Sequence, residues 1–161
     1  MKIIIGQLII LAMLISSCNN SQNNEEKKQS EAPAKLHIED YDFSVKDNFK
    51  FIPYNKAIYQ RGDEVYLVLK NVGPFVRGTD SLNRAEMKME IFDALGDTVV
   101  VQENLFGERG HADFENNILK KPFAVFRPNN SNKIGKYTFK VTVYDLISGD
   151  STSISDDFYI E

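Results

Sequence analysis

Cysteine, histidine and tryptophan are nearly absent from this sequence. The chain of 161 residues has one cysteine, two histidines and no tryptophan. A lone cysteine leaves no second thiol for an internal disulfide, so any folded domain must be stabilised by its hydrophobic core. Zinc sites draw mainly on cysteine and histidine, and we therefore expect no zinc site and no other cofactor.

The scarcity of histidine also argues against an enzyme. A Ser-His-Asp triad would need His37 or His111 to be positioned by a buried acid, and no Gly-x-Ser-x-Gly elbow is present. Gly149-Asp150-Ser151 matches the Gly-Asp-Ser motif of some lipases, but such residues are typical of a hairpin turn. We therefore expect a non-enzymatic protein.

No strong charge imbalance points to a polyanionic partner. The chain has 19 basic and 23 acidic residues, for a formal net charge of -4. Nucleic-acid binding would favour a basic stripe, and a polybasic membrane patch would need a local excess of Lys and Arg. We expect no nucleic-acid partner.

The start of the chain has the features of a secretion signal. Lys2 gives a positive beginning, and residues 3–15 are almost wholly apolar. This run is shorter than the about 20 residues that a membrane-spanning helix needs. It has the length of the apolar part of a signal peptide, so residues 1–17 are predicted to be one.

The single cysteine follows this signal directly. Ile15-Ser16-Ser17-Cys18 resembles the lipobox of bacterial lipoproteins, in which an aliphatic residue and two small residues precede the cysteine. The resemblance implies that Cys18 receives a diacylglycerol, becomes the first mature residue and is acylated, with palmitate as an expected chain. Each buried CH₂ contributes about 0.8 kcal/mol, so several chains hold a protein stably on a membrane. Asn19 replaces the Asp of the Gram-negative inner-membrane retention rule, which favours the outer membrane and leaves periplasmic or surface exposure open.

Residues 18–35 are predicted to be the lipidated cysteine and a flexible tether. After Cys18 the segment reads NNSQNNEEKKQSEAPAK, with no apolar residue larger than Ala or Pro. Such a segment cannot bury enough surface to offset the entropy of ordering. Its expected r.m.s. reach is roughly 20 to 25 Å.

Residues 36–161 show the alternation that is typical of half-buried strands. The clearest examples are residues 64–72, 85–92, 137–143 and 152–160. Seven to eight such strands predict an all-β domain, an antiparallel β-sandwich of two sheets.

Two stretches resemble immunoglobulin-like domains of bacterial surface proteins. They are residues 62–67 (GDEVYL) and residues 135–141 (GKYTFKV). The resemblance implies that Tyr137 is a tyrosine-corner residue, whose hydroxyl bonds to backbone at the end of the sandwich. It also implies a binding or spacing role outside the cytoplasm.

Two long connections, 71–84 and 104–122, carry apolar residues. Phe75 and Val76 lie in the first, and Leu105 and Phe106 lie in the second. Connections of this length are often functional. Two interpretations stay open: these four side chains cap the core, or they recognise a protein partner.

The first connection also contains Asp80-Ser81-Leu82, which resembles an O-glycosylation signal of some Gram-negative envelope proteins. Other matches occur, but Ser81 is favoured because it lies in a long polar loop. We therefore expect Ser81 to be a glycosylation site.

Together these features predict a membrane-anchored cell-envelope lipoprotein whose β-sandwich binds an envelope protein. The alternative is a carbohydrate-binding lipoprotein that serves glycan uptake, because exposed aromatic side chains commonly stack on sugars. Its candidate platform consists of Tyr54, Tyr59, Tyr66 and Tyr144.

The lipid anchor makes a direct prediction. We expect radiolabelled fatty acid to enter the wild-type protein in growing cells and not to enter Cys18→Ala, because only the cysteine carries the acceptor thiol. Equal labelling of the two proteins would contradict the anchor.

Overall fold

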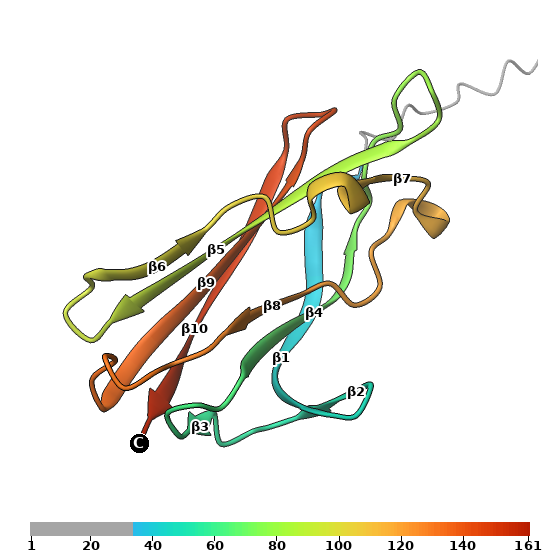
Figure 1. Ribbon diagram of the computed structural model, residues 1–161. Helices are drawn as coiled ribbons and strands as arrows, with labels where there is room; N and C mark the ends of the chain where they lie inside the picture. The colour runs from blue at the N-terminus through green and yellow to red at the C-terminus, as the bar shows by residue number, and fades with distance from the viewer. Residues whose placement is uncertain (1–33) are drawn as a thin grey trace, which may run out of the picture. The chain divides into compact units, whose positions relative to one another are not determined.

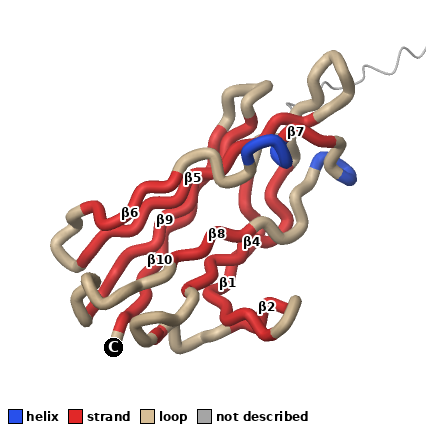
Figure 2. The backbone as a smooth tube through the Cα atoms, viewed as in Figure 1, coloured by secondary structure: helices blue, strands red, loops and turns tan. Residues whose placement is uncertain are grey.

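The computed structural model describes residues 34–161, which form ten β-strands and two short 3₁₀ helices arranged as two sheets (Figure 1). Figure 2 shows that helix is confined to two single turns. Within this described part, no helix is long and apolar enough to cross a membrane. The predicted signal peptide, Cys18 and nearly all of the predicted tether lie outside it.

The first sheet has four antiparallel strands in the order β2-β1-β4-β8. Their bounds are β1 (His37–Asp47), β2 (Lys50–Pro53), β4 (Val65–Gly73) and β8 (Phe123–Phe126). The central strand β4 is the predicted strand 64–72. Its residues Val65, Leu67 and Leu69 share the buried inner face, as predicted.

The second sheet has the order β3-β10-β9-β5-β6, with the short β7 paired to the beginning of β5. Their bounds are β3 (Ile58–Tyr59), β5 (Asn83–Asp93), β6 (Thr98–Gln102), β7 (His111–Ala112), β9 (Gly135–Asp145) and β10 (Ser151–Ile160). Only the β3–β10 pair is parallel. The predicted all-β sandwich is therefore confirmed, with ten strands instead of seven to eight.

Aromatic rings from both sheets form the centre of the core. Phe158 of β10 lies 5.9 Å from Phe43 of β1 and 6.0 Å from Phe126 of β8, measured between ring centroids. It also lies 6.1 Å from Phe139 of its neighbour β9. Tilted and edge-on ring pairs at such distances stabilise a core beyond the burial of their area. These contacts hold the two sheets face to face.

The outer face of the first sheet differs from the prediction. Tyr66 lies on the face opposite the core, as the alternation predicted, but it is only 3% exposed. Its ring centroid lies 5.2 Å from that of Phe51 and 5.8 Å from that of Phe123, which cover it. The Tyr66 hydroxyl donates to Glu64, which also accepts from Arg127, and these two bonds hold the pKa of Glu64 below its usual value.

Two core tyrosines differ in what their hydroxyl groups contact. The Tyr137 hydroxyl donates to the backbone carbonyl of Lys133 at 2.8 Å, which is the bond predicted for a tyrosine corner. The hydroxyl of Tyr59 is buried and has no hydrogen-bond partner among the described residues, and burial raises its pKa. The first hydroxyl should therefore stabilise the fold, whereas the second should not.

This contrast gives a matched pair of variants. We expect Tyr137→Phe to lose about 1 kcal/mol of unfolding free energy, because the Lys133 carbonyl loses its donor. Tyr59→Phe should be neutral or stabilising, because it removes a buried hydroxyl without a partner. Urea unfolding of both variants measures the difference. Equal losses would show that Tyr59 has a partner in solution.

Candidate functional site

One buried asparagine joins the two long connections. Asn83, the first residue of β5, is fully buried. Its side-chain nitrogen donates to the Val76 carbonyl at 3.1 Å and to the Phe75 carbonyl at 3.4 Å. Its side-chain oxygen accepts from the backbone N–H of Phe114 at 3.0 Å. A single amide therefore holds the β4–β5 connection against the β6–β8 connection.

A buried carboxylate ties a third segment to the same end of the sandwich. Asp145, at the end of β9, accepts from the backbone N–H of Val76 at 2.8 Å. It also accepts from the N–H of Ile147 at 2.9 Å, in the turn that leads to β10. These bonds satisfy the carboxylate with backbone donors, as a buried polar group requires.

The residues predicted in the first connection have different surroundings. Phe75 is 2% exposed and packs against Phe114, with ring centroids 5.4 Å apart. Its side chain caps the core and is not accessible to a partner. Val76 is 43% exposed beside it.

Ser81, the predicted glycosylation site, is exposed at a turn. The N–H of Ser81 donates to the Gly78 carbonyl and closes this turn. Its glycosylation stays a prediction.

The second connection is fixed to β5 by hydrogen bonds from two of its backbone N–H groups. Leu105 donates its N–H to the Met87 carbonyl at 2.9 Å. Phe106 donates its N–H to the Glu86 carboxylate, also at 2.9 Å. The 3₁₀ helix η1 (Gly107–Gly110) then lies so close to β5 that a Cβ on Gly110 would stand 2.0 Å from a backbone oxygen. Only glycine permits this approach.

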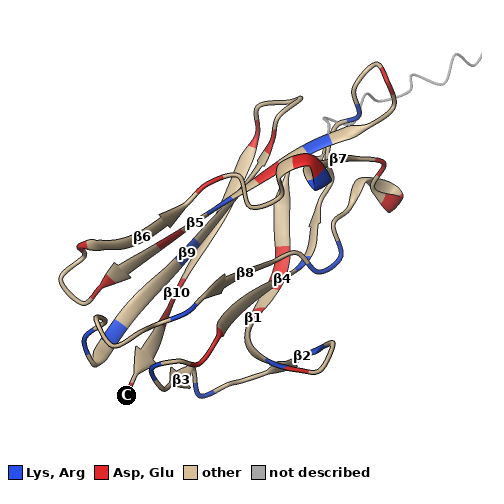
Figure 3. Ribbon diagram, viewed as in Figure 1, with Lys and Arg blue, Asp and Glu red and all other residues tan. Residues whose placement is uncertain are grey.

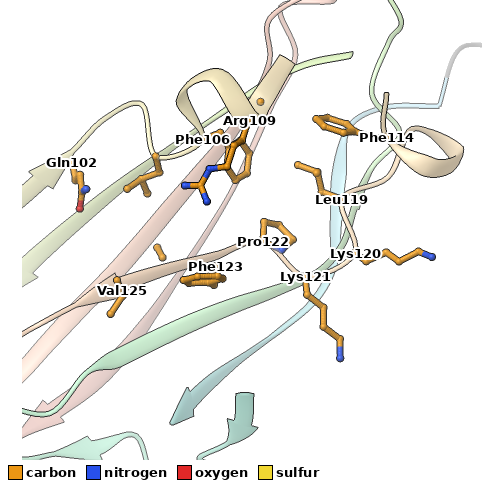
Figure 4. A pocket seen from close by; sticks show the side chains of 13 residues that line it. Gln102, Phe106, Arg109, Phe114, Leu119, Lys120, Lys121, Pro122, Phe123 and Val125 are labelled. Atoms are coloured by element: carbon orange, nitrogen blue, oxygen red, sulfur yellow. The ribbon is translucent and has the colours of Figure 1, made fainter. Parts of the chain in front are cut away.

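Leu105 and Phe106 form one wall of a groove of about 500 Å³ (Figure 4). The opposite wall consists of β8 and the residues just before it, including Leu119, Pro122 and Phe123. Most of these lining side chains are apolar. Volumes of this size are typical of ligand sites, so the groove is the strongest candidate site in the described part of the chain.

Basic side chains surround this apolar surface. Arg109 and Lys121 lie within salt-bridge distance of no carboxylate among the described residues. Lys120 is paired with Glu115, 2.5 Å from its carboxylate, and this hydrogen bond lowers the pKa of Glu115. Figure 4 shows the Arg109 guanidinium beside the ring of Phe106, whereas Lys120 and Lys121 point away from the groove. Arg109 is therefore the cation that can meet an anionic group inside the groove.

The groove continues along the whole of β8. A second hollow of about 520 Å³ shares Gln102 and Val125 with the first one. It is lined by β6 on one side and by β8 with the segment after it on the other. Its far end is polar, with Asn129 and Asn132. The two hollows are thus one groove between the edges of the two sheets, which we call the edge groove.

The histidines lie apart in the described structure. A ring nitrogen of His37 is 3.2 Å from the Lys35 carbonyl, and Nε2 of His111 is 3.5 Å from Asp80. Over residues 34–161, no serine hydroxyl is hydrogen-bonded to either ring, and no three His, Cys, Asp or Glu residues are placed to hold a metal ion. The predicted tyrosine platform is not exposed as a row, because Tyr59 and Tyr66 are buried.

Two basic residues of the edge groove were not among the sequence candidates. Arg109 is only three residues after Phe106 in the same connection, whereas Lys121 joins Leu105 and Phe106 only in the folded chain. The local signals are Arg109 just after Leu105-Phe106 and Lys120-Lys121 directly before a short apolar strand, and both combinations are too common to single out a site.

No protein-family model matches this chain, and no curated protein matches it. The edge groove and the sequence features are the observations that bear on its function.

The role of Asn83 can be tested by substitution. We expect Asn83→Ala to lose about 2 to 3 kcal/mol of unfolding free energy, because the buried N–H of Phe114 loses its acceptor. Amide exchange at Phe114 should also become faster. Asn55→Ala is the control, because Asn55 is exposed and its loss should stay within about 0.5 kcal/mol. Similar losses of unfolding free energy for both variants would contradict the conclusion that Asn83 holds the two connections together.

Proposed function

We propose that this chain is a lipid-anchored protein of the cell envelope whose β-sandwich binds a protein partner and catalyses no reaction. The anchor is supported by the sequence, in which a positive start and an apolar run lead to the lipobox-like residues before Cys18. The binding role is supported by one observation: the edge groove joins apolar walls to the Arg109 guanidinium, which has no carboxylate partner among residues 34–161.

We also propose that the sandwich is immunoglobulin-like. The order β1-β4-β8 corresponds to strands A, B and E of that fold, and β10-β9-β5-β6 corresponds to G, F, C and C′. Tyr137 stands near the start of β9, where the tyrosine corner of strand F is found. This assignment supports a binding scaffold, although a fold alone does not define a function.

The shape of the edge groove favours a protein over a small molecule. It is an open channel that extends past the full length of β8 and is bounded by two strand edges. Small-molecule sites enclose most of their ligand. An open channel with exposed backbone suits an extended chain.

A carbohydrate-binding role is the second candidate, and a separate hollow of about 420 Å³ favours it. Tyr41, Tyr54 and Tyr159 line this hollow together with Asp156 and Asp157. Aromatic faces beside carboxylates are suited to stacking on sugar rings and accepting bonds from their hydroxyl groups.

Site-specific photo-crosslinking in living cells tests the protein-binding role. A photoreactive residue replacing Phe106 in the full-length protein should crosslink to one envelope protein. The same residue replacing Ile134, which is 65% exposed outside the groove, is the positional control. Arg109→Glu combined with Lys121→Glu should reduce the crosslink about tenfold, because the rim charge is reversed. Lys133→Glu, exposed elsewhere, should not reduce it.

Two outcomes would contradict the proposal. Equal crosslinking from positions 106 and 134 would show that the edge groove is not the docking surface. Recovery of a defined glycan, with no protein, and loss of that glycan on Tyr159→Ala would favour the carbohydrate-binding role.

A further inference from the structure

One edge of β8 faces the edge groove with its backbone. Within residues 34–161, the first sheet ends at β8, which pairs only with β4. The Leu69 N–H of β4 donates to the Pro122 carbonyl at 2.8 Å. This bond determines which residues of β8 direct their backbone groups toward β4. Backbone groups alternate in direction along an antiparallel strand. Ala124 therefore directs its N–H and C=O toward β4, whereas Phe123 and Val125 direct theirs outward.

Neither strand beside the edge groove carries a charge. β8 reads FAVF and β6 reads TVVVQ. Exposed strand edges are normally blocked by charges, proline or a covering segment, because they attract other strands. The opposite edge strand of the first sheet, β2, has both Lys50 and Pro53. The edge of β8 is thus unusually open within the described fold.

The path of the chain leaves room for a strand at this edge. In the constant-type immunoglobulin sandwich, strand D lies beside strand E, which corresponds here to β8. After β6 the chain instead forms η1, β7 and η2 (Glu115–Asn117), and it reaches β8 without pairing a strand to its outer edge. The edge groove occupies this position.

The rim indicates the charge of the segment that would fit. Lys120 and Lys121 precede β8, and Arg127 follows it (Figure 3). Lys120 is already paired with Glu115 and Arg127 with Glu64, so of these three cations Lys121 alone has no carboxylate partner in the described structure. Arg109 adds a guanidinium from the opposite wall. Guanidinium groups bind carboxylates through paired hydrogen bonds. Acidic residues in an otherwise apolar strand would complement both the rim and the walls.

A second copy of this chain fits less well. The β8 strand of a second copy reads FAVF and would bring no carboxylate to the Arg109 guanidinium. A segment that carries Asp or Glu would supply one.

We propose that the edge groove binds an extended segment of the protein partner, with apolar residues alternating with Asp or Glu, as an added strand on β8. This inference rests on the proposed function and specifies how the partner is held. Backbone hydrogen bonds to Phe123 and Val125 supply affinity, and contacts with Phe106 and Arg109 supply selectivity.

A random peptide library selected against the full-length protein in detergent tests the proposal. Selected peptides should alternate apolar residues with Asp or Glu. An enriched peptide, made synthetically, should slow amide exchange at Phe123 and Val125 when it binds. It should slow exchange much less at Ala124, whose N–H already bonds to β4.

Val125→Pro is the decisive variant. Proline removes the outward N–H, leaves the bonds between β4 and β8 in place, and is tolerated in edge strands. We expect it to weaken the peptide at least about tenfold, since one backbone bond and the approach of the strand are both lost. Val125→Thr keeps the N–H and should bind normally. The exchange measurement on the wild type decides the matter if the proline variant is unstable.

The charge of the peptide provides a second comparison. Arg109→Gln with Lys121→Gln should weaken the acidic peptide about threefold to tenfold, as expected for exposed ion pairs. It should not affect a peptide whose acids are replaced by amides. Lys133→Gln should leave both peptides unchanged.

Several results would overturn strand addition. They are a selection without acidic enrichment, unchanged binding by Val125→Pro, or protection confined to residues outside β8. A dimer that dissociates on Val125→Pro would identify a second copy as the occupant instead. A crosslink from position 106 that survives Val125→Pro would leave the proposed function standing and reject only this mode of binding. Absence of both the crosslink and peptide binding would reject the two together.

Discussion

The side-chain amide of Asn83 is the contact on which the arrangement of both long connections depends. It meets backbone groups of Phe75, Val76 and Phe114, none of which lies in a continuous ladder with another strand at that point. A buried polar group of this kind stabilises a fold only while its partners are in place. The wall that carries Leu105 and Phe106 belongs to one of these connections. The shape of the edge groove is therefore linked to a residue that does not line it.

The connection after β6 covers one end of the sandwich and leaves the outer edge of β8 uncovered. After β6, the chain crosses the end of the sandwich, where Phe75 and Phe114 pack together, instead of pairing beside β8. The same segment that seals the core thus creates the edge groove. Open edges risk aggregation. In the proposed mode of binding, Arg109 would favour an acidic segment over the β8 strand of a second copy, which carries no carboxylate.

The sequence predicted the long strands because their apolar residues alternate, and it predicted the Tyr137 hydroxyl bond because its motif is local. The strands β2, β3 and β7 are too short to show a period. Phe75 and Phe106 have similar local surroundings in the sequence, yet only Phe75 enters the core, because Asn83 and Phe114 hold it there. The edge groove could not be predicted either, since only tertiary packing brings β6 beside β8.

The ladder of the first sheet also has a mechanical consequence. The described chain begins its sheet at His37, whose strand β1 pairs with β4 from Gly73 to Tyr66, and β4 pairs in turn with β8. Consider a force that pulls on His37 along β1, and an opposite force on a partner that is bound to β8. These two forces act along the strands, so they load the ladder in shear. Many hydrogen bonds then share the force instead of breaking one after another. In the proposed arrangement, this sheet would carry the tension between the lipid anchor and the bound partner.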